Sequence, residues 1–172
     1  MNATHIATLR KFICPQQIEV MLSNTRGEEG QYFRDMIERL AGLVTTMPKT
    51  YDQDGIGDAA IVHLHYFRGN MDWFITERDV ETPEEPGQHQ AFGLADLGYG
   101  GELGYISIVE LIRAGVDFDL YWTPRTLGEV KAKRAGKAVD FHDDKPDERA
   151  DMHVTTQPGD LDLVGRPLRP GS

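Results

Sequence analysis

The chain of 172 residues has one cysteine, Cys14, so no disulfide can form within it. It also lacks any run of 18 or more apolar residues, the length that a membrane-spanning helix requires. The N-terminal residues are not basic and lead into no apolar stretch, so we expect no secretory signal. These absences favour a soluble protein of the reducing cytoplasm that does not contact membranes.

Basic residues are scarce, because 18 Lys and Arg stand against 28 Asp and Glu and leave a formal net charge of −10. The imbalance lies in residues 50–120, which carry fourteen acidic and three basic side chains. A negative field repels nucleic acid phosphates and attracts basic proteins. We therefore expect no direct nucleic acid binding. A merely soluble surface is the simpler interpretation, and a basic protein partner is the more specific one.

The periodicity of apolar residues predicts a single α+β domain over residues 1–135. Helical spacing predicts helices within 1–48, and the clearest apolar stripe lies in 28–46. After residue 60 the period changes to two, which predicts strands near 61–67, 73–75, 91–97, 103–106 and 118–122. The expected fold has N-terminal helices packed on a mainly antiparallel sheet of four or five strands. Seven residues are expected to build much of the sheet and core: Trp73, Phe74, Ile75, Leu103, Tyr105, Leu120 and Trp122.

Two capping boxes predict short helices, one from Ser107 to Glu110 and one from Thr126 to Glu129. Gly115 stands where a left-handed residue would end the first of them. From residue 136 to residue 172, four prolines, five basic and eight acidic residues are scattered without apolar periodicity. This segment is expected to be an acidic, flexible tail that is either disordered or ordered only by a partner.

His63 and His65 lie two residues apart on a predicted strand, so both imidazoles are expected on one face. Such a pair can bind a divalent metal when a third ligand is near, and Glu77 and His89 are candidates. No third and fourth ligand stands at a fixed spacing, so a pair that only shares a sheet face is the simpler interpretation. A small metal-dependent enzyme using this pair remains an alternative.

The acidic block suggests a second kind of site. Duplex DNA carries about one charge per ~1.7 Å of its axis, and a surface dense in carboxylates can copy that field. Such a surface could occupy the DNA-binding cleft of a basic protein. The carboxylates expected to contact this partner are Asp52, Asp54, Asp58, Glu77, Asp79, Glu81, Glu84 and Glu85.

Four stretches occur in a characteristic order between about residues 51 and 130: Asp72–Glu77, Ala91–Gly93, Glu102–Ser107 and Asp119–Pro124. In this order the chain resembles an uncharacterised family of short bacterial proteins encoded on plasmids and integrative elements. The resemblance implies a mobile-element setting, often near antirestriction and conjugation genes. It implies no catalytic residues and does not extend to residues 1–48 or to the tail.

Three functional hypotheses follow. The first is a non-enzymatic acidic binding or inhibitor protein that masks a basic DNA-binding surface of a host nuclease or defence complex. The second is the metal-dependent enzyme at His63 and His65. The third is an accessory subunit that docks through the basic helix at 131–134 and the tail. An exposed edge strand could also pair with another copy, so the oligomeric state stays open.

Overall fold

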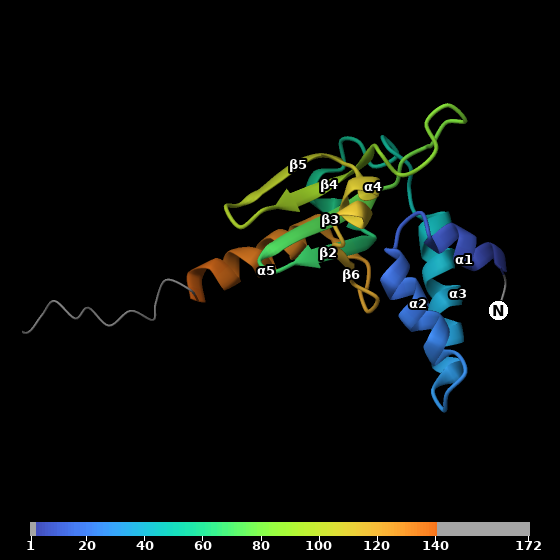
Figure 1. Cartoon of the computed structure of the whole chain (residues 1–172). Coiled ribbons are helices and arrows are strands. Elements are labelled where there is room, and N and C mark those ends of the chain that lie inside the picture. The colour runs from blue at the N-terminus through green and yellow to red at the C-terminus, as the bar shows by residue number, and fades with distance from the viewer. Residues whose placement is uncertain (1–2, 141–172) are drawn as a thin grey trace, which may run out of the picture. The chain divides into compact units, whose positions relative to one another are not determined.

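The computed structural model describes residues 3–140, and Figure 1 shows their arrangement. The chain divides into two compact units, Met1–Ala135 and Gly136–Ser172. The fold and the site described below belong to the first unit. The prediction of a flexible tail at 136–172 lies outside the described residues, apart from the end of one helix.

Three helices form the N-terminal part: α1 (Ala3–Leu9), α2 (Pro15–Asn24) and α3 (Gly30–Thr46). The apolar stripe of α3 is buried, as its helical spacing predicts. Gly30 begins α3 so close to the end of α2 that a Cβ atom there would overlap the carbonyl group of Thr25. The two helices are therefore joined by a tight turn that only glycine fits.

Five strands form an antiparallel sheet in the order β5-β4-β3-β2-β6. They are β2 (Leu64–Arg68), β3 (Met71–Glu77), β4 (Ala91–Asp96), β5 (Gly101–Ile106) and β6 (Asp117–Phe118). A short 3-10 turn, η1 (Gly57–Ala59), precedes a separate pair made by β1 (Ile61–Val62) and β7 (Arg125–Thr126). The register between β3 and β4 shifts between Ile75 and Glu77, which marks a bulge. The predicted α+β fold with a mainly antiparallel sheet is confirmed.

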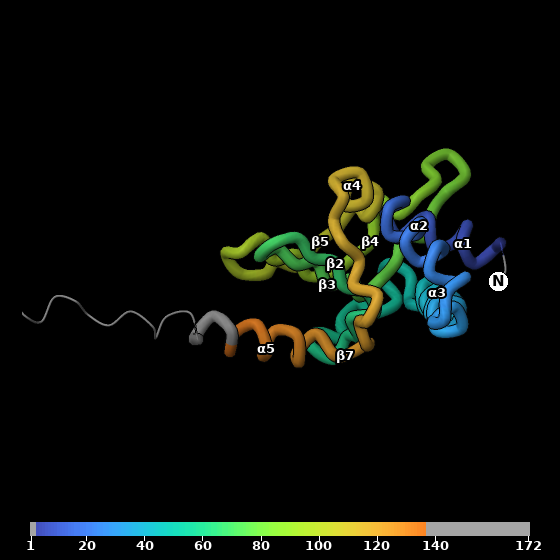
Figure 2. Tube along the Cα trace, turned by 60° about the horizontal axis from the view of Figure 1, so that its bottom comes forward, coloured from blue at the N-terminus to red at the C-terminus, as the bar shows by residue number. Residues whose placement is uncertain are grey.

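Helices cover both faces of this sheet. Helices α1 to α3 and α4 (Ile108–Arg113) share the main apolar core with one face, which contributes Leu64, Tyr66 and Ile75. The opposite face carries Phe74 and Leu94, which form a smaller core with Leu127 and Val130 of α5 (Leu127–Asp140). Figure 2 shows α4 and α5 on opposite sides of the sheet. No helix within the described residues is long and apolar enough to cross a membrane.

Both predicted helix starts are capped, and the full reciprocal capping box forms between Thr126 and Glu129. The hydroxyl of Ser107 accepts a hydrogen bond from the Glu110 N–H at 3.3 Å. The hydroxyl of Thr126 accepts from the Glu129 N–H at 3.2 Å, and the Glu129 carboxylate accepts from the Thr126 N–H at 2.8 Å. Gly115 follows α4 with φ 66°, the left-handed conformation expected of it.

The predicted strand at 118–122 is shorter than expected, because the chain turns away from the sheet after Phe118. The Asp119 carboxylate accepts a hydrogen bond from the Tyr121 N–H at 3.1 Å, a local turn that competes with strand pairing. Leu120 then packs against the main core, while Trp122 reaches the smaller core on the other side of the sheet. The alternation of Phe118, Leu120 and Trp122 therefore comes from a segment that passes from one core to the other, rather than from one continuous strand.

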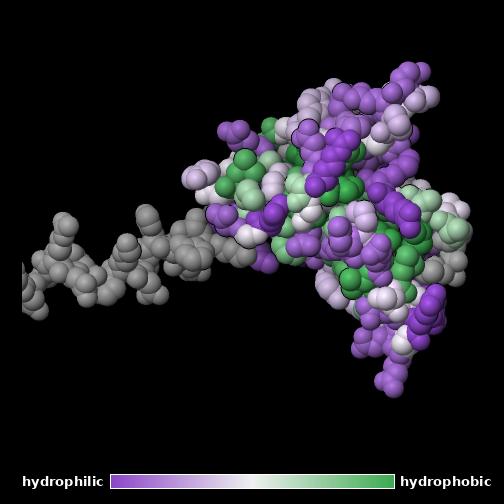
Figure 3. Space-filling view, viewed as in Figure 1, coloured by the Kyte–Doolittle hydropathy of each residue, from purple (hydrophilic) through white to green (hydrophobic). Residues whose placement is uncertain are grey.

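Five of the seven residues expected in the sheet and core pack into one of the two cores, but Leu103 and Tyr105 do not. These two side chains on β5 are 49% and 55% exposed. Leu94, the cross-strand partner of Leu103, is only 3% exposed. Helix α5 therefore packs over β4 on this face of the sheet but leaves β5 exposed. Figure 3 shows hydrophobic residues at the surface near the β4–β5 end of the sheet, among hydrophilic ones.

Candidate functional site

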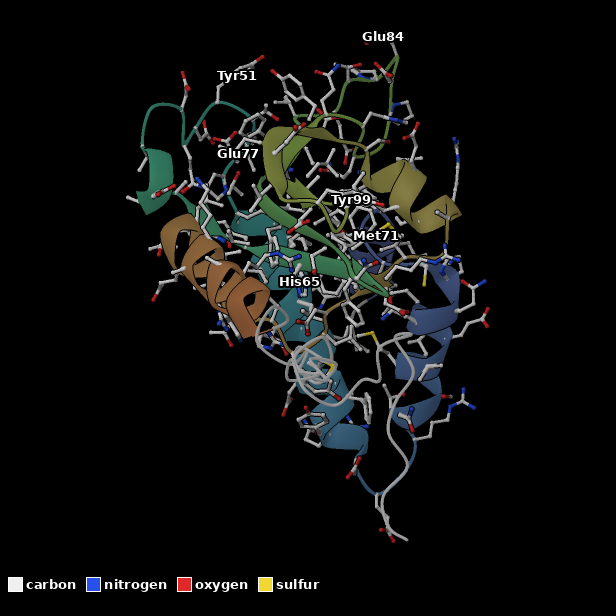
Figure 4. All side chains as sticks on the ribbon, turned by 90° about the vertical axis from the view of Figure 1, so that its left-hand side faces the viewer. Tyr51, His65, Met71, Glu77, Glu84 and Tyr99 are labelled. Carbon is white, nitrogen blue, oxygen red and sulfur yellow. The ribbon has the colours of Figure 1, made fainter. Side chains whose placement is uncertain are left out.

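His65 lies on the sheet face that α5 covers, and both nitrogens of its ring contact carboxylates (Figure 4). Nδ1 is 3.0 Å from an oxygen of Asp119, and Nε2 is 2.8 Å from an oxygen of Asp72. The ring stacks on Phe74 with their centroids 4.7 Å apart. Both ring nitrogens are therefore engaged by carboxylates of the protein itself.

Arg134 of α5 extends this network across the sheet face. Its guanidinium pairs with the Asp72 carboxylate and, at 2.6 Å, with Asp96. Burial raises the pKa of Asp96, but hydrogen bonds from the Gly98 N–H and from Arg134 outweigh it and hold the pKa below its ordinary value. The network of His65, Asp72, Asp96, Asp119 and Arg134 thus ties α5 and the segment after β6 to the sheet.

Within the described residues, the structure brings no third metal ligand to His63 and His65. His63 stands between β1 and β2 rather than within one continuous strand, and burial lowers its pKa. The carboxylates at His65 bond different ring nitrogens, so they cannot converge on one ion. Within residues 3–140, no group of three or more His, Cys, Asp or Glu side chains could hold a metal ion.

Three of the eight predicted partner-binding carboxylates support the protein's own loops instead. Asp79 accepts hydrogen bonds from the backbone N–H groups of residues 81, 89 and 90, at 3.1, 3.0 and 2.9 Å. Glu81 accepts from Lys11 and from the buried Gln88, both at 2.6 Å. Glu77 is the most buried of the eight, at 4% exposed. Carboxylates in such positions stabilise the fold and present little charge to a partner.

The other five carboxylates lie on two exposed loops. Asp52 accepts a hydrogen bond from the Lys49 N–H at 2.8 Å, and Asp58 pairs with Lys131 at 2.6 Å. Asp54, Glu84 and Glu85 are exposed, and no cation among residues 3–140 pairs with them. Figure 4 shows Glu84 at the outer end of its loop, separated from the loop that carries Tyr51. The exposed charge of the eight predicted carboxylates is therefore divided between two loops.

Tyr51 has a backbone conformation that is unusual for its residue type. Its φ angle is 78°, in the left-handed region that side chains other than glycine rarely adopt. The buried Glu77 carboxylate holds it there by accepting hydrogen bonds from the N–H groups of Tyr51 at 3.0 Å and Gln53 at 2.5 Å. The Gln53 side chain in turn bonds the backbone of Ile61 and Thr76. A strained residue that neighbours hold this firmly is a reason to look for function there.

The strained backbone places the Tyr51 side chain against the uncovered edge of the sheet. Its hydroxyl lies 2.5 Å from the hydroxyl of Tyr105, whose ring meets Phe92 edge-on with centroids 5.6 Å apart. Leu103 lies two residues before Tyr105 on β5 and so projects from the same face. We call Tyr51, Phe92, Leu103 and Tyr105 the tyrosine surface. Tyr51 is 70% exposed, so this apolar group is open to a partner.

The electrostatic setting of the tyrosine surface is negative. The hydrogen bond with Tyr51 raises the pKa of the Tyr105 hydroxyl, with smaller contributions from burial and from the carboxylates of Glu77 and Asp54. The Tyr105 hydroxyl therefore remains protonated at neutral pH. The surface can offer aromatic faces and neutral hydroxyl groups beside negative charge, a combination that suits contact with a cationic, partly apolar segment.

Comparison with known proteins places the central region in one family. Residues 35–125, just over half of the chain, match the family described as a protein of unknown function, DUF2958. The protein belongs to the DUF2958 family. No curated protein and no solved structure matches the chain. The DUF2958 region contains all four residues of the tyrosine surface together with Glu77, but it ends before Arg134.

Sequence reasoning missed the tyrosine surface for a physical reason. Tyr51 and Tyr105 are far apart in the chain, and their contact depends on the left-handed backbone at Tyr51. No turn motif in the sequence signals that conformation, because the interaction that holds it comes from Glu77 on the distant strand β3. Alternation along β5 indicated which residues share a face, and it could not indicate that α5 leaves this face uncovered.

Proposed function

We propose that this DUF2958 protein is a non-enzymatic binding protein whose partner contacts the tyrosine surface. The observation that carries the proposal is the strained Tyr51, held by the buried Glu77 and directed at the exposed Tyr105. Strain of this kind costs roughly 1–3 kcal/mol and persists where surrounding contacts impose it. Exposed tyrosines beside apolar residues are the groups that anchor protein partners, because they bury a large area and lose little entropy.

The partner in this proposal is a basic protein. Residues 50–120 supply most of the negative charge, and Asp54 and Glu77 contribute to the field at Tyr105. That charge repels nucleic acid, so the surface is not proposed to bind DNA or RNA directly. Imitation of DNA by carboxylates alone has less support, because Glu77, Asp79 and Glu81 serve internal hydrogen bonds and Asp58 has its own lysine.

The biological setting of the proposal rests on the resemblance described above. A protein of a bacterial mobile element that works in the cytoplasm would meet host nucleases and defence complexes, whose DNA-binding clefts are basic. Covering the rim of such a cleft with the tyrosine surface would exclude DNA by steric overlap and by charge. We therefore propose a nuclease or defence complex with an exposed basic segment as the target.

Affinity capture from a bacterial lysate tests the proposal. The wild-type protein should retain a basic partner at about 50 mM salt and release most of it at about 500 mM, because salt screens charge contacts beyond a few ångströms. Tyr105→Ala should lose that partner even at low salt. Tyr121→Ala is the matched control, because Tyr121 is 68% exposed and lies outside the tyrosine surface. Equal retention by both variants would contradict the proposed site.

A further inference from the structure

Strand β5 is an open edge of the sheet. Its only neighbour is β4, and within the described part of the chain its backbone makes no hydrogen bond to any other segment. Every second residue of an edge strand directs its N–H and C=O groups outward, where they can pair with another strand. Proteins usually block such edges with proline, lysine or a covering loop, and β5 contains neither proline nor lysine.

We infer that an extended segment of the basic partner pairs with β5 and adds a sixth strand to the five-stranded sheet. The inference rests on the proposed function and states how the partner binds. Backbone hydrogen bonds to the edge would give affinity, and side chains on alternate positions would give specificity. The tyrosine surface would then extend along one face of the added strand.

The two faces of β5 specify the chemistry of the partner segment. Leu103 and Tyr105 project from one face, so the strand added there should carry apolar side chains beside them. Glu102 and Gly104 occupy the other face, and Glu102 is exposed. A Lys or Arg of the added strand would lie beside Glu102 on that face. The segment is therefore expected to alternate apolar and basic residues.

Gly104 supports this arrangement. A Cβ atom at Gly104 would meet nothing within 4 Å, and its φ angle lies outside the left-handed region, so the free protein has room for a side chain there. Its partner across the strands, Gly93, is different, because a Cβ there would overlap the Phe74 carbonyl oxygen. The missing side chain at Gly104 thus leaves open space beside the edge, where a long basic side chain of an added strand can lie.

Charge decides between another protein and a second copy of this chain. Two copies paired through β5 would bring together two acidic surfaces, each from a chain of net charge −10. Like charges brought together across an interface are unfavourable. The C-terminal segment 136–172 is also acidic, with eight acidic and five basic residues, so it is a poor occupant. A basic segment of another protein complements the edge.

Short peptides provide the test. The probe is a capped heptapeptide that alternates lysine and valine, Lys-Val-Lys-Val-Lys-Val-Lys, titrated against the full chain by calorimetry at low salt. Two further forms carry N-methyl groups on the valine amides or on the lysine amides. In a bound strand, one of these two sets of amides faces β5 and the other faces solvent. One methylated form should therefore bind like the parent, and the other should bind at least about tenfold more weakly.

Each outcome has a distinct meaning. Strand addition is supported if only one methylated form binds the wild-type protein, and if that binding is lost in the Glu102→Lys variant and kept in the Tyr121→Ala variant. Equal binding of both methylated forms overturns strand addition, and sensitivity of that binding to Tyr105→Ala would leave the proposed function standing. Failure of the parent peptide to bind also overturns strand addition. The proposed function is tested separately, by capture of the natural partner with the Tyr105→Ala variant and the Tyr121→Ala control.

Discussion

Replacing Glu77 by glutamine should destabilise the protein by about 2–4 kcal/mol. The carboxylate is 4% exposed and accepts hydrogen bonds from two backbone N–H groups, those of Tyr51 and Gln53. A glutamine amide has one acceptor oxygen, so its NH₂ group would face one of these donors and leave it unsatisfied. A hydrogen bond to a charged group contributes about 1.5–3 kcal/mol, and a buried donor without a partner costs about 1–3 kcal/mol.

Urea unfolding followed by tryptophan fluorescence measures this loss. Glu84→Gln is the control, because Glu84 carries the same charge in the same acidic block and is exposed without a cation partner. That change should alter the free energy of unfolding by less than about 0.5 kcal/mol. If the two variants had equal stability, Glu77 would not anchor the loop, and the account of the strained Tyr51 would be wrong.

Two further predictions concern a close strand contact and a half-buried histidine. Gly93→Ala should lower the free energy of unfolding by about 1–3 kcal/mol, because the new Cβ would overlap the Phe74 carbonyl of β3. Gly104→Ala, directly opposite on β5, should change it by less than about 0.5 kcal/mol. Thermal unfolding of both variants checks this, and equal losses of stability would contradict the close approach of β3 and β4. Burial lowers the pKa of His63 below 6.5, so the folded state binds fewer protons than the unfolded state at mildly acidic pH, and stability should fall as pH drops from about 7 to about 5. His63→Gln should reduce this slope, and an unchanged slope would show that His63 does not cause it.

Local signals predicted much of the fold. The capping boxes at Ser107 and Thr126 fix helix starts through contacts three residues apart, so the sequence alone contains the whole interaction. The stripe of α3 and the alternation in β2 to β5 predicted the helices and strands in the same way. The strand expected at 118–122 forms but ends at Phe118, because the Asp119 side chain forms a local turn that alternation of apolar residues does not reveal.

The candidate site depends on distant contacts and was predicted only in part. Glu77 was expected to contact a partner because it is acidic. In the structure its side chain bonds the Tyr51 loop instead, next to the bulge between Ile75 and Glu77. His65 was weighed as a metal ligand only as an alternative, and Asp72 and Asp119 contact both nitrogens of its ring from other segments. Tyr105 is exposed because α5 does not extend over β5. That follows from how the helix packs on the sheet, which the periodicity of the sequence does not reveal.

The most direct test of the account is hydrogen exchange of the full chain with and without its captured partner. Binding at the tyrosine surface predicts slower exchange of backbone amides in residues 50–54 and in β5, with no change in α3, which lies on the opposite face of the sheet. Protection confined to the acidic loop at 81–85, with residues 50–54 and 101–106 unchanged, would contradict the central claim that the partner binds at the tyrosine surface.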